Sequence, residues 1–359
     1  MRIIFTPEGF NQRYGGVSRV FAELAFRLNQ SGHDARIIGG LYINDYIDGM
    51  QAVVGYRVPD FGKIRSLVNT ALCAVSIALW KGALVHQTYY SQHYYQRSHP
   101  LVLTVFDMTH EIYADLFAAY PDHLQQSRNK ARCCLRANHI CAISHHTKND
   151  LIRILGVPEE KVSVTYLGNP LAEVAPEEII PPENKKYLLH VGGRGFYKNF
   201  PKLLQAFRAS EILMRSYRLV CFGGGAFAEE EIALISKLGL IRHVLYRTGG
   251  DQLLAGYYQK AAAHVSVSLY EGFGLTLVEA MGLRCPVICS DRASLPEVAG
   301  EAASYFNPED PEDIRNTLEQ TLSSQATLDQ LVQAGAQRAK LFTWEHCLAA
   351  TLSAYGKVA

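Results

Sequence analysis

Two glutamates flank a glycine-rich turn in a segment that reads Ser-Leu-Tyr-Glu-Gly-Phe-Gly-Leu-Thr-Leu-Val-Glu from Ser268 to Glu279. Glu271 stands just before the turn, and Glu279 follows it with seven residues between the two carboxylates. An ionised carboxylate accepts hydrogen bonds, and it can take them from two neighbouring hydroxyls of a sugar. The spacing therefore predicts a site for sugar hydroxyls on both sides of the turn.

The flanking elements explain how this segment would be positioned. The β-branched alternation of Ala263–Leu269 predicts a strand, and the Leu, Val, Ala and Met content of Leu275–Leu283 predicts a helix. Glu271 then lies in the loop at the C-terminal edge of the strand. Glu279 lies about one turn into the following helix.

The turn itself, Gly272-Phe273-Gly274, is suited to an anion. Glycine lets the backbone come close to a ligand. The N–H groups of Leu275 and Thr276 open the helix and have no acceptor within it. A helix start of this kind binds phosphate, and phosphate beside sugar hydroxyls is the chemistry of a nucleotide-sugar site.

A second loop carries two cations. Arg194 and Lys198 follow the predicted strand Tyr187–Val191, with Gly193 before them and Asn199 after them. Cations at the C-terminal end of a strand suit a diphosphate, because they neutralise the charge that grows on it as it leaves. The alternative is a solvated pair of loop residues, and the glycines and the strand-end placement favour the functional interpretation.

Composition excludes several classes of protein. The 359 residues are enough for two domains, and 35 Lys+Arg against 34 Asp+Glu give no indication of nucleic-acid binding. The eight cysteines form no C-x-x-C pair, so we expect buried thiols rather than disulfides or a zinc site. The chain begins with a predicted strand, and its longest apolar run, Ser66–Trp80, is short for a bilayer. These features predict a soluble, cytoplasmic protein.

Strand and helix patterns alternate along nearly the whole chain, which is typical of doubly wound α/β domains. Besides the segments already named, the predicted strands are Arg2–Phe5, Asp34–Ile38, Ala83–His86, Leu101–Phe106, His139–Ala142, Val162–Thr165, Arg218–Phe222, Val244–Arg247 and Pro286–Ser290. The predicted helices are Gly16–Gln30, Ser66–Trp80, Asp122–Ala137, Thr147–Leu155, Phe200–Ser210, Glu229–Lys237 and Asp251–Ala262, with two more closing the chain.

The proline-rich, aperiodic segment 171–186 divides this pattern into two domains, 1–170 and 187–342. The last helix, around residues 343–359, could pack back on the first domain. Two such domains would face each other across a central cleft, because open α/β sheets bind ligands at the C-terminal edges of their strands.

In these motifs the chain resembles the retaining glycosyltransferases of family 4, which have the GT-B fold of two Rossmann-like domains. The resemblance runs nearly end to end and rests on the order and spacing of several motifs. They are Gly15-Gly16-Val17-Ser18-Arg19, Ala142-Ile143-Ser144, Gly193-Arg194 with Lys198-Asn199, Ser268–Glu279, Pro286-Val287-Ile288 and Leu295-Pro296-Glu297-Val298.

The resemblance implies that the C-terminal domain binds a nucleoside diphosphate sugar and that the N-terminal domain contributes most acceptor contacts. Glu271 would bind hydroxyls of the transferred sugar and Glu279 those of the ribose, while Arg194 and Lys198 would hold the diphosphate. It also implies a front-face mechanism with retention, in which a leaving-group oxygen takes the acceptor proton. Catalysis is then expected to need no metal and no cofactor. The sequence agrees, because it has no Asp-x-Asp motif at a strand end of the kind that binds a metal and a diphosphate.

The first predicted domain offers weaker candidates. Gly16 opens a helix after the first strand, and Arg19 lies one turn further, where it would hold an acceptor or phosphate or form a surface salt bridge. Asp107 and His110 follow a strand. Many relatives have a His-Asp pair at this point, whereas Phe106 precedes Asp107 here, so either residue would contact substrate or Asp107 would cap the turn.

Two further clusters leave alternatives open. Tyr89 and Tyr90, with Tyr94, Tyr95, His86 and His93 nearby, would line an acceptor pocket or pack as an ordinary loop. Arg128, Arg132 and Arg136, with Lys130, recur along one predicted helix. Such a basic face is usually solvated, and the other interpretation is contact with anionic lipid headgroups around a lipid-linked acceptor.

The donor is expected to be a GDP-activated mannose-type or 6-deoxy sugar, with a UDP-sugar as the next choice, and the acceptor a growing surface polysaccharide or O-antigen. Rival functions are a catalytically silent nucleotide-sugar binding protein, a phosphorylase-type enzyme that needs orthophosphate or pyridoxal phosphate, and an oxidoreductase with two Rossmann-like domains. The last is disfavoured because no G-x-G-x-x-G follows the first strand.

Overall fold

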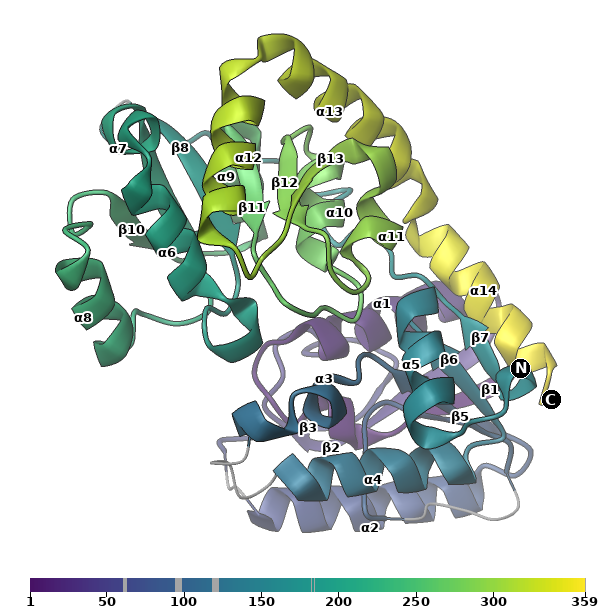
Figure 1. Ribbon diagram of the computed structural model, residues 1–359. Coiled ribbons are helices and arrows are strands. Elements are labelled where there is room, and N and C mark those ends of the chain that lie inside the picture. Colours follow the sequence, from purple (N-terminus) through teal and green to yellow (C-terminus); the bar gives the residue numbers. More distant parts are fainter. Residues whose placement is uncertain (61–62, 94–98, 118–122, 182, 184, 359) are drawn as a thin grey trace. The chain divides into compact units, whose positions relative to one another are not determined.

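A computed structural model describes residues 1–60, 63–93, 99–117, 123–181, 183 and 185–358. Its contacts divide the chain into two compact units (Figure 1). The first unit comprises Met1–Gly168 together with Trp344–Ala359, and the second comprises Asn169–Thr343. The last helix therefore belongs to the first unit, although it follows the second in sequence.

The described part of the first unit is built on a parallel seven-stranded sheet with strand order β3-β2-β1-β4-β5-β6-β7. Its central strands are buried along nearly their whole length, because helices cover both faces of a parallel sheet. The strands are β1 (Arg2–Phe5), β2 (Asp34–Tyr42), β3 (Val53–Arg57), β4 (Leu84–Gln87), β5 (Leu101–Val105), β6 (His139–Ala142) and β7 (Val162–Val164).

The helices of this unit connect neighbouring strands or close the chain. They are α1 (Gly16–Gln30), α2 (Lys63–Leu79), α3 (Thr109–Ile112), α4 (His123–Arg136), α5 (His145–Leu155) and α14 (Trp344–Gly356), with short 3₁₀ turns at Pro7–Phe10, Ala114–Phe117 and Glu159–Lys161. Helix α5 shows the local signals well. The Ser144 hydroxyl caps its first turn by accepting from the Thr147 N–H, and Gly156 ends it in the left-handed conformation.

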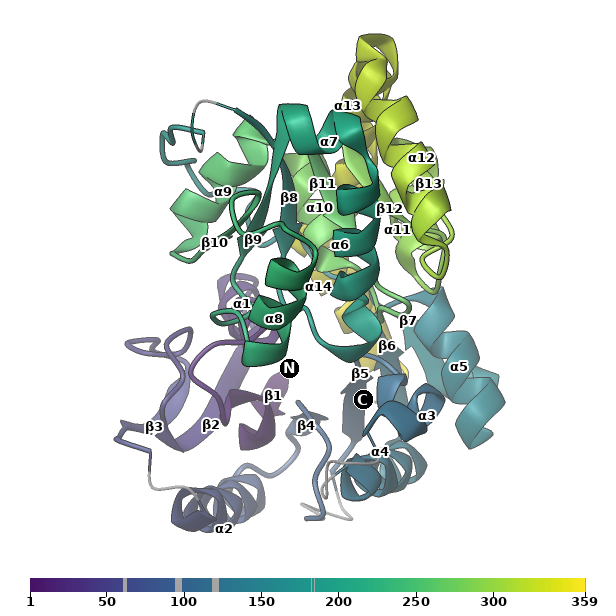
Figure 2. The same cartoon turned by 60° about the vertical axis from the view of Figure 1, so that its left-hand side comes forward.

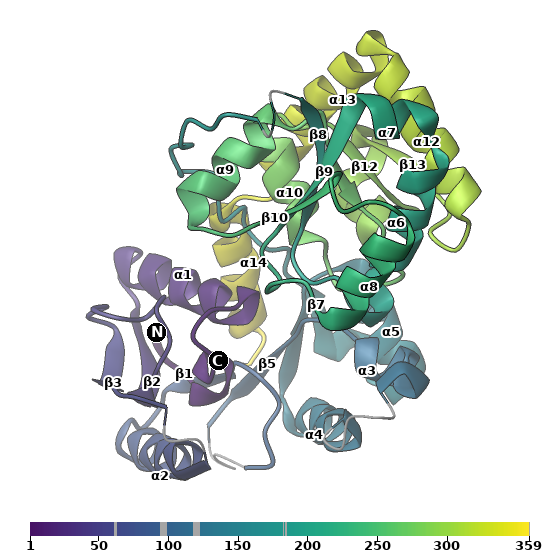
Figure 3. The same ribbon diagram turned by 90° about the vertical axis from the view of Figure 1, so that its left-hand side faces the viewer.

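Helices α2 and α4 cover the same face of this sheet, as two side chains of β5 show. Leu101 of β5 packs with Cys73 of α2, and Leu103 of the same strand packs with Cys133 of α4. Because side chains two apart on a strand point to the same face, both helices lie on that face. Helices α1 and α14 pack against each other (Figure 3). Phe5, next to Ile4 of the α2 core, contacts Phe21 of α1, which places α1 on the opposite face.

Helix α14 is held by a buried hydrogen-bonded histidine. The Tyr355 hydroxyl lies 2.7 Å from Nδ1 of His86, and the Thr104 hydroxyl lies 2.8 Å from its Nε2. Burial lowers the pKa of His86 to about 3, so the ring is neutral. The expectation that His86 lines an acceptor pocket is wrong, since the ring is fully enclosed in the core.

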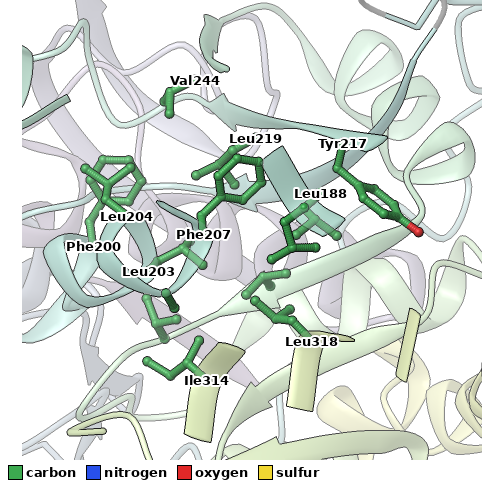
Figure 4. Packing of buried hydrophobic residues seen from close by; sticks show 14 of the residues in the cluster. Leu188, Phe200, Leu203, Leu204, Phe207, Tyr217, Leu219, Val244, Ile314 and Leu318 are labelled. Atoms are coloured by element: carbon green, nitrogen blue, oxygen red, sulfur yellow. The ribbon is translucent and has the colours of Figure 1, made fainter. Parts of the chain in front are cut away.

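The described part of the second unit contains a parallel six-stranded sheet of order β10-β9-β8-β11-β12-β13. Its strands are β8 (Lys186–Val191), β9 (Tyr217–Phe222), β10 (Val244–Arg247), β11 (Ala263–Ser266), β12 (Val287–Ser290) and β13 (Ala303–Phe306). Its helices are α6 (Phe200–Ala209), α7 (Glu211–Ser216), α8 (Glu229–Lys237), α9 (Asp251–Lys260), α10 (Leu275–Gly282), α11 (Leu295–Ala299), α12 (Pro311–Ser323) and α13 (Gln325–Arg338). Leu203 and Phe207 of α6 pack on the strands and on Ile314 of α12 (Figure 4).

The segment between the two sheets is tied to the second unit. The Glu177 N–H donates to the Gln252 carbonyl of α9, 2.9 Å away, and Ile179 is buried. Gly256 makes this close approach possible, because a Cβ at its position would lie 2.2 Å from the Glu177 carbonyl oxygen. In the described part of the chain, no helix combines the length and apolarity needed to cross a membrane.

We expect Tyr355→Phe to lower the free energy of unfolding by about 1–2 kcal/mol, because one nitrogen of the buried His86 ring loses its partner. Urea denaturation at pH 7 measures the change. Tyr56→Phe, at an exposed position of β3, is the control and should stay within about 0.5 kcal/mol. Equal effects of the two substitutions would show that the His86–Tyr355 contact does not hold α14.

Candidate active site

The predicted site residues of the second unit gather where its strand order reverses. Strands β8 and β11 are paired at the centre of the sheet, while the strand that follows β8 lies on one side and the strand that follows β11 lies on the other. The connections after the two central strands therefore diverge to opposite faces, and the C-terminal edge at such a reversal point is where open α/β sheets bind ligands. Loops 192–199 and 267–274 border this point (Figure 2).

An ion pair joins these two loops. Nζ of Lys198 lies 2.7 Å from Oε1 of Glu271, and both side chains are partly exposed. The Ser268 hydroxyl donates to the same carboxylate oxygen at 2.7 Å, and the Ser294 hydroxyl donates to the Glu271 carbonyl at 2.8 Å. The structure thus brings Lys198 and Glu271 together, with the carboxylate oriented before any ligand binds.

Asn199 fixes the shape of the first loop. It adopts the left-handed conformation, with φ of 59°, and both of its side-chain hydrogen bonds from Nδ2 go to carbonyls, those of Val267 and Pro308. The amide hydrogens of Asn199 therefore tie the loops together, and the predicted donor contact of Asn199 stays a prediction. By contrast, a Cβ at Gly193 would meet open space, so its backbone is approachable.

In the turn before α10, Phe273 packs into the core and Gly274 leads into the first turn of the helix. The ring of Phe273 is buried edge-on against Phe342 and anchors the turn in the core. Donor binding by the backbone of this turn stays a prediction. Gly274 has φ of 88° and a Cβ there would lie 2.6 Å from Leu295. The Leu277 N–H donates to the Gly274 carbonyl. Gly272 is buried at the start of the same turn.

The first two N–H groups of α10, those of Leu275 and Thr276, precede the intrahelical ladder and remain suited to an anion. The Thr276 hydroxyl lies 3.2 Å from Nε2 of His264, whose Nδ1 faces the Leu189 carbonyl at 3.1 Å. Burial lowers the pKa of His264 to about 3. The neutral ring therefore donates from Nδ1 and accepts from Thr276, which holds the first turn of the helix in place.

Glu279 is oriented by a tyrosine that the sequence did not single out. The Tyr258 hydroxyl donates to Oε2 of Glu279 at 2.9 Å, and Glu279 as a whole is only 7% exposed. Burial and the adjacent carboxylate raise the pKa of Tyr258 well above its ordinary value, so it remains a donor. Tyr258 and His264 lie in a helix and a strand that look like core elements, and only their neighbours in space show their role.

Arg194 has a different environment from Lys198. Its side chain is 2% exposed, and its guanidinium donates to both carboxylate oxygens of Glu231 and to the carbonyls of Gly223, Gly225 and Ala226 at 2.8–3.2 Å. It also lies over the ring of Phe227. These hydrogen bonds hold the glycine loop after β9, and contact between Arg194 and the diphosphate stays a prediction.

The first unit has a cavity at its own reversal point, between β1 and β4. This cavity of about 410 Å³ is lined by Glu8, Gly9, Asn11, Gln12, Val17 and Tyr89. The Tyr89 prediction is thus compatible with a ligand pocket. The Tyr90 hydroxyl is buried, its ring lies beside Lys130, and it is not among the lining residues. Tyr94 and Tyr95 lie outside the described residues.

The remaining candidates of the first unit are placed as follows. Gly16 is exposed at the start of α1, and the Arg19 guanidinium lies 5.6 Å from the centre of the Tyr46 ring. Asp107 caps its turn by accepting from the Thr109 N–H at 3.0 Å. The His110 ring is 4.6 Å from that of Phe117, and it is partly buried. Substrate contact by these residues stays a prediction.

The comparisons with known proteins agree with this architecture. Residues 14–173 match the family described as "Glycosyltransferase Family 4", and residues 173–338 match "Glycosyl transferases group 1". The O-antigen chain mannosyltransferase B of Escherichia coli is 25% identical, over 99% of each chain. The serotype-specific mannosyltransferase WbdA of the same species is 30% identical over 62% of this chain and 29% of its own length.

Solved structures show the same fold at low sequence identity. The sucrose-phosphate synthase of Thermosynechococcus elongatus superposes with a TM-score of 0.77 at 17% identity, over 99% of this chain and 98% of that one. HepE of Anabaena, in complex with UDP and glucose, gives 0.74 at 17% identity, over 98% and 99%. Two parallel α/β units with these neighbours define the GT-B fold. The chain belongs to glycosyltransferase family 4.

The different environments of Arg194 and Lys198 predict different mutant phenotypes. Arg194→Met should lower the free energy of unfolding by about 3 kcal/mol or more, because it leaves Glu231 and three carbonyls without their donor. Lys198→Met should stay within about 1 kcal/mol, because its ion pair is partly solvated. Its turnover should still fall at least about 100-fold.

Urea denaturation and donor turnover, measured on both variants, check these expectations. A stable, inactive Arg194→Met protein would place the guanidinium at the diphosphate after all. A fully active Lys198→Met protein would show that Lys198 is not needed to bind the diphosphate.

Proposed function

We propose that this glycosyltransferase moves mannose from GDP-mannose to a hydroxyl of a growing surface polysaccharide such as an O-antigen, with retention at the anomeric carbon. The observation that carries the proposal is the Lys198–Glu271 pair beside the start of α10, a cation and a carboxylate 2.7 Å apart at the reversal point of the sheet. Mannosyltransferases among the relatives, including one that is similar over the full length, support the sugar and the acceptor class.

The diphosphate is proposed to bind between Lys198 and the N–H groups of Leu275 and Thr276. These groups neutralise the negative charge that grows on the leaving group, which is the main electrostatic demand of the reaction. When Nζ of Lys198 turns to the phosphate, Glu271 keeps its bond from Ser268 and becomes available to hydroxyls of the transferred sugar.

Glu279 is proposed to hold the ribose. Its carboxylate is fixed by Tyr258 and stands one helical turn beyond the phosphate-binding N–H groups. A carboxylate can accept from both vicinal hydroxyls of a ribose, so the arrangement fits a nucleoside diphosphate and needs no protonated glutamate.

The acceptor is proposed to bind in the cavity of the first unit. Tyr89 offers an aromatic face on which a sugar ring can stack, and Glu8 offers hydrogen-bond acceptors for hydroxyls. Retention would follow a front-face course, in which the bond to the diphosphate breaks first and a leaving-group oxygen takes the proton of the incoming hydroxyl. Positioning and charge stabilisation then carry the catalysis.

Nucleotide binding tests the donor assignment. We expect GDP and GDP-mannose to raise the thermal midpoint of the wild type more than UDP, ADP or CMP and their sugars do. A ligand at a hundred times its dissociation constant adds about 2.7 kcal/mol, a shift of a few degrees. Glu279→Gln should remove the shift, while Glu309→Gln, at an exposed position, should keep it. A shift with UDP alone would show that the donor carries uracil and not guanine. No shift with any nucleoside diphosphate would contradict the proposed donor site.

The reaction is expected to proceed without a divalent metal, because Lys198 and the start of α10 supply the positive charge at the diphosphate. Transfer from GDP-mannose should keep its rate after dialysis against EDTA and should not rise when Mg²⁺ or Mn²⁺ is added back. The control is a metal-dependent glycosyltransferase treated in parallel. Loss of activity on dialysis and recovery with Mg²⁺ would contradict the expectation.

A further inference from the structure

Helix α2 presents an unusual outer surface. Leu67, Leu72, Val75 and Leu79 are 71%, 44%, 57% and 76% exposed, and they lie within an arc of about 140° on the helix. We call these four residues the apolar row. Between Ser66 and Trp80 the sequence has no charged residue. Single exposed leucines are ordinary, whereas four on one helix face mark a surface that binds something.

Helix α4 presents a row of cations instead. Arg128, Arg132 and Arg136 are exposed and recur every four residues, so they lie on one face of the helix. We call these three residues the basic row. Lys130, expected from the sequence to belong with them, points the other way and is buried against Glu111. Leu135 is 75% exposed and lies on the same face as the basic row.

The two rows look outward from the same side of the first unit. Helices α2 and α4 pack on one face of its sheet, as the positions of Leu101 and Leu103 show, so their exposed sides both point away from that face (Figure 2). Neither helix contains an Asp or Glu. The two helices therefore contribute apolar and positive side chains to this surface and no carboxylate of their own.

We infer that this surface, formed by the apolar row of α2 and the basic row of α4, docks on an anionic lipid bilayer. Leucines and valine enter the acyl boundary while the arginines meet the anionic headgroups, which is the pattern of an interfacial helix. A second copy of the chain fits less well, because self-pairing of this face would bring the two basic rows together without acidic partners. The inference does not depend on the identity of the donor.

Vesicle flotation tests the inference on the full-length protein. Wild type should bind vesicles of phosphatidylcholine with 30% phosphatidylglycerol, and binding should be far weaker to pure phosphatidylcholine or in 0.5 M NaCl. R128Q/R132Q/R136Q should bind about 100-fold more weakly, at roughly 1 kcal/mol per cation. L67Q/L79Q should lose about 10-fold or more, and this loss should persist at high salt.

Matched substitutions on the second unit serve as controls. R208Q/R215Q and I241Q change exposed residues of the same types and should leave vesicle binding unchanged. All variants should keep the wild-type thermal midpoint and their transfer to a short water-soluble acceptor, which separates this test from that of the proposed reaction. Wild-type binding that is equal on neutral vesicles, or lost equally in the controls, would overturn the inference. So would a dimer in sedimentation that L67Q/L79Q dissociates without any effect on vesicles.

Discussion

The reversal of strand order at the centre of the second sheet is the constraint on which the site depends. Right-handed crossovers oblige the connections after β8 and β11 to leave toward opposite faces, so the sheet edge between them stays open. The loop with Lys198 and the turn with Glu271 then meet at that edge although 73 positions separate them in sequence. The ion pair between them, 2.7 Å long, exists because the topology places the two loops side by side. The first unit repeats the arrangement at β1 and β4, where its cavity lies.

Burial decides what each charge near this edge can do. Arg194 and Lys198 are four positions apart in one loop, yet the first is enclosed with Glu231 and three carbonyls and the second is partly solvated. An enclosed guanidinium with its hydrogen bonds made is costly to move, whereas a partly exposed lysine can exchange one anion for another. The same principle separates the two glutamates. Glu279 is buried and held by Tyr258, whereas Glu271 and its partner Lys198 are both partly exposed to solvent. Buried Arg194 and Glu279 are thus held by neighbouring residues, whereas Lys198 and Glu271 are partly exposed to solvent.

Sequence patterns predicted the elements with strong periodicity and missed the weak ones. Bounds of α1 and α8 match the prediction because amphipathic helices with clear ends carry their own signal. Strands β3 and β13 were not predicted, because they are short edge strands and only partly buried. Helix α7 was not predicted, because it is only six residues long. Lys198 and Glu271 could be predicted from glycine-rich loops at strand ends. The intrachain contacts of Arg194, Asn199 and Phe273 could not, since Glu231, Pro308 and Phe342 lie far along the chain and only the fold brings them close.

A crystal structure of the protein with bound GDP tests the central claim most directly. The account predicts diphosphate oxygens within about 3 Å of Nζ of Lys198 and of the Leu275 and Thr276 N–H groups. It also predicts that Glu279 accepts from the ribose hydroxyls while Arg194 keeps its bonds to Glu231. A nucleotide bound away from the C-terminal ends of β8 and β11, or a diphosphate held by Arg194 with Lys198 still paired to Glu271, would contradict the account.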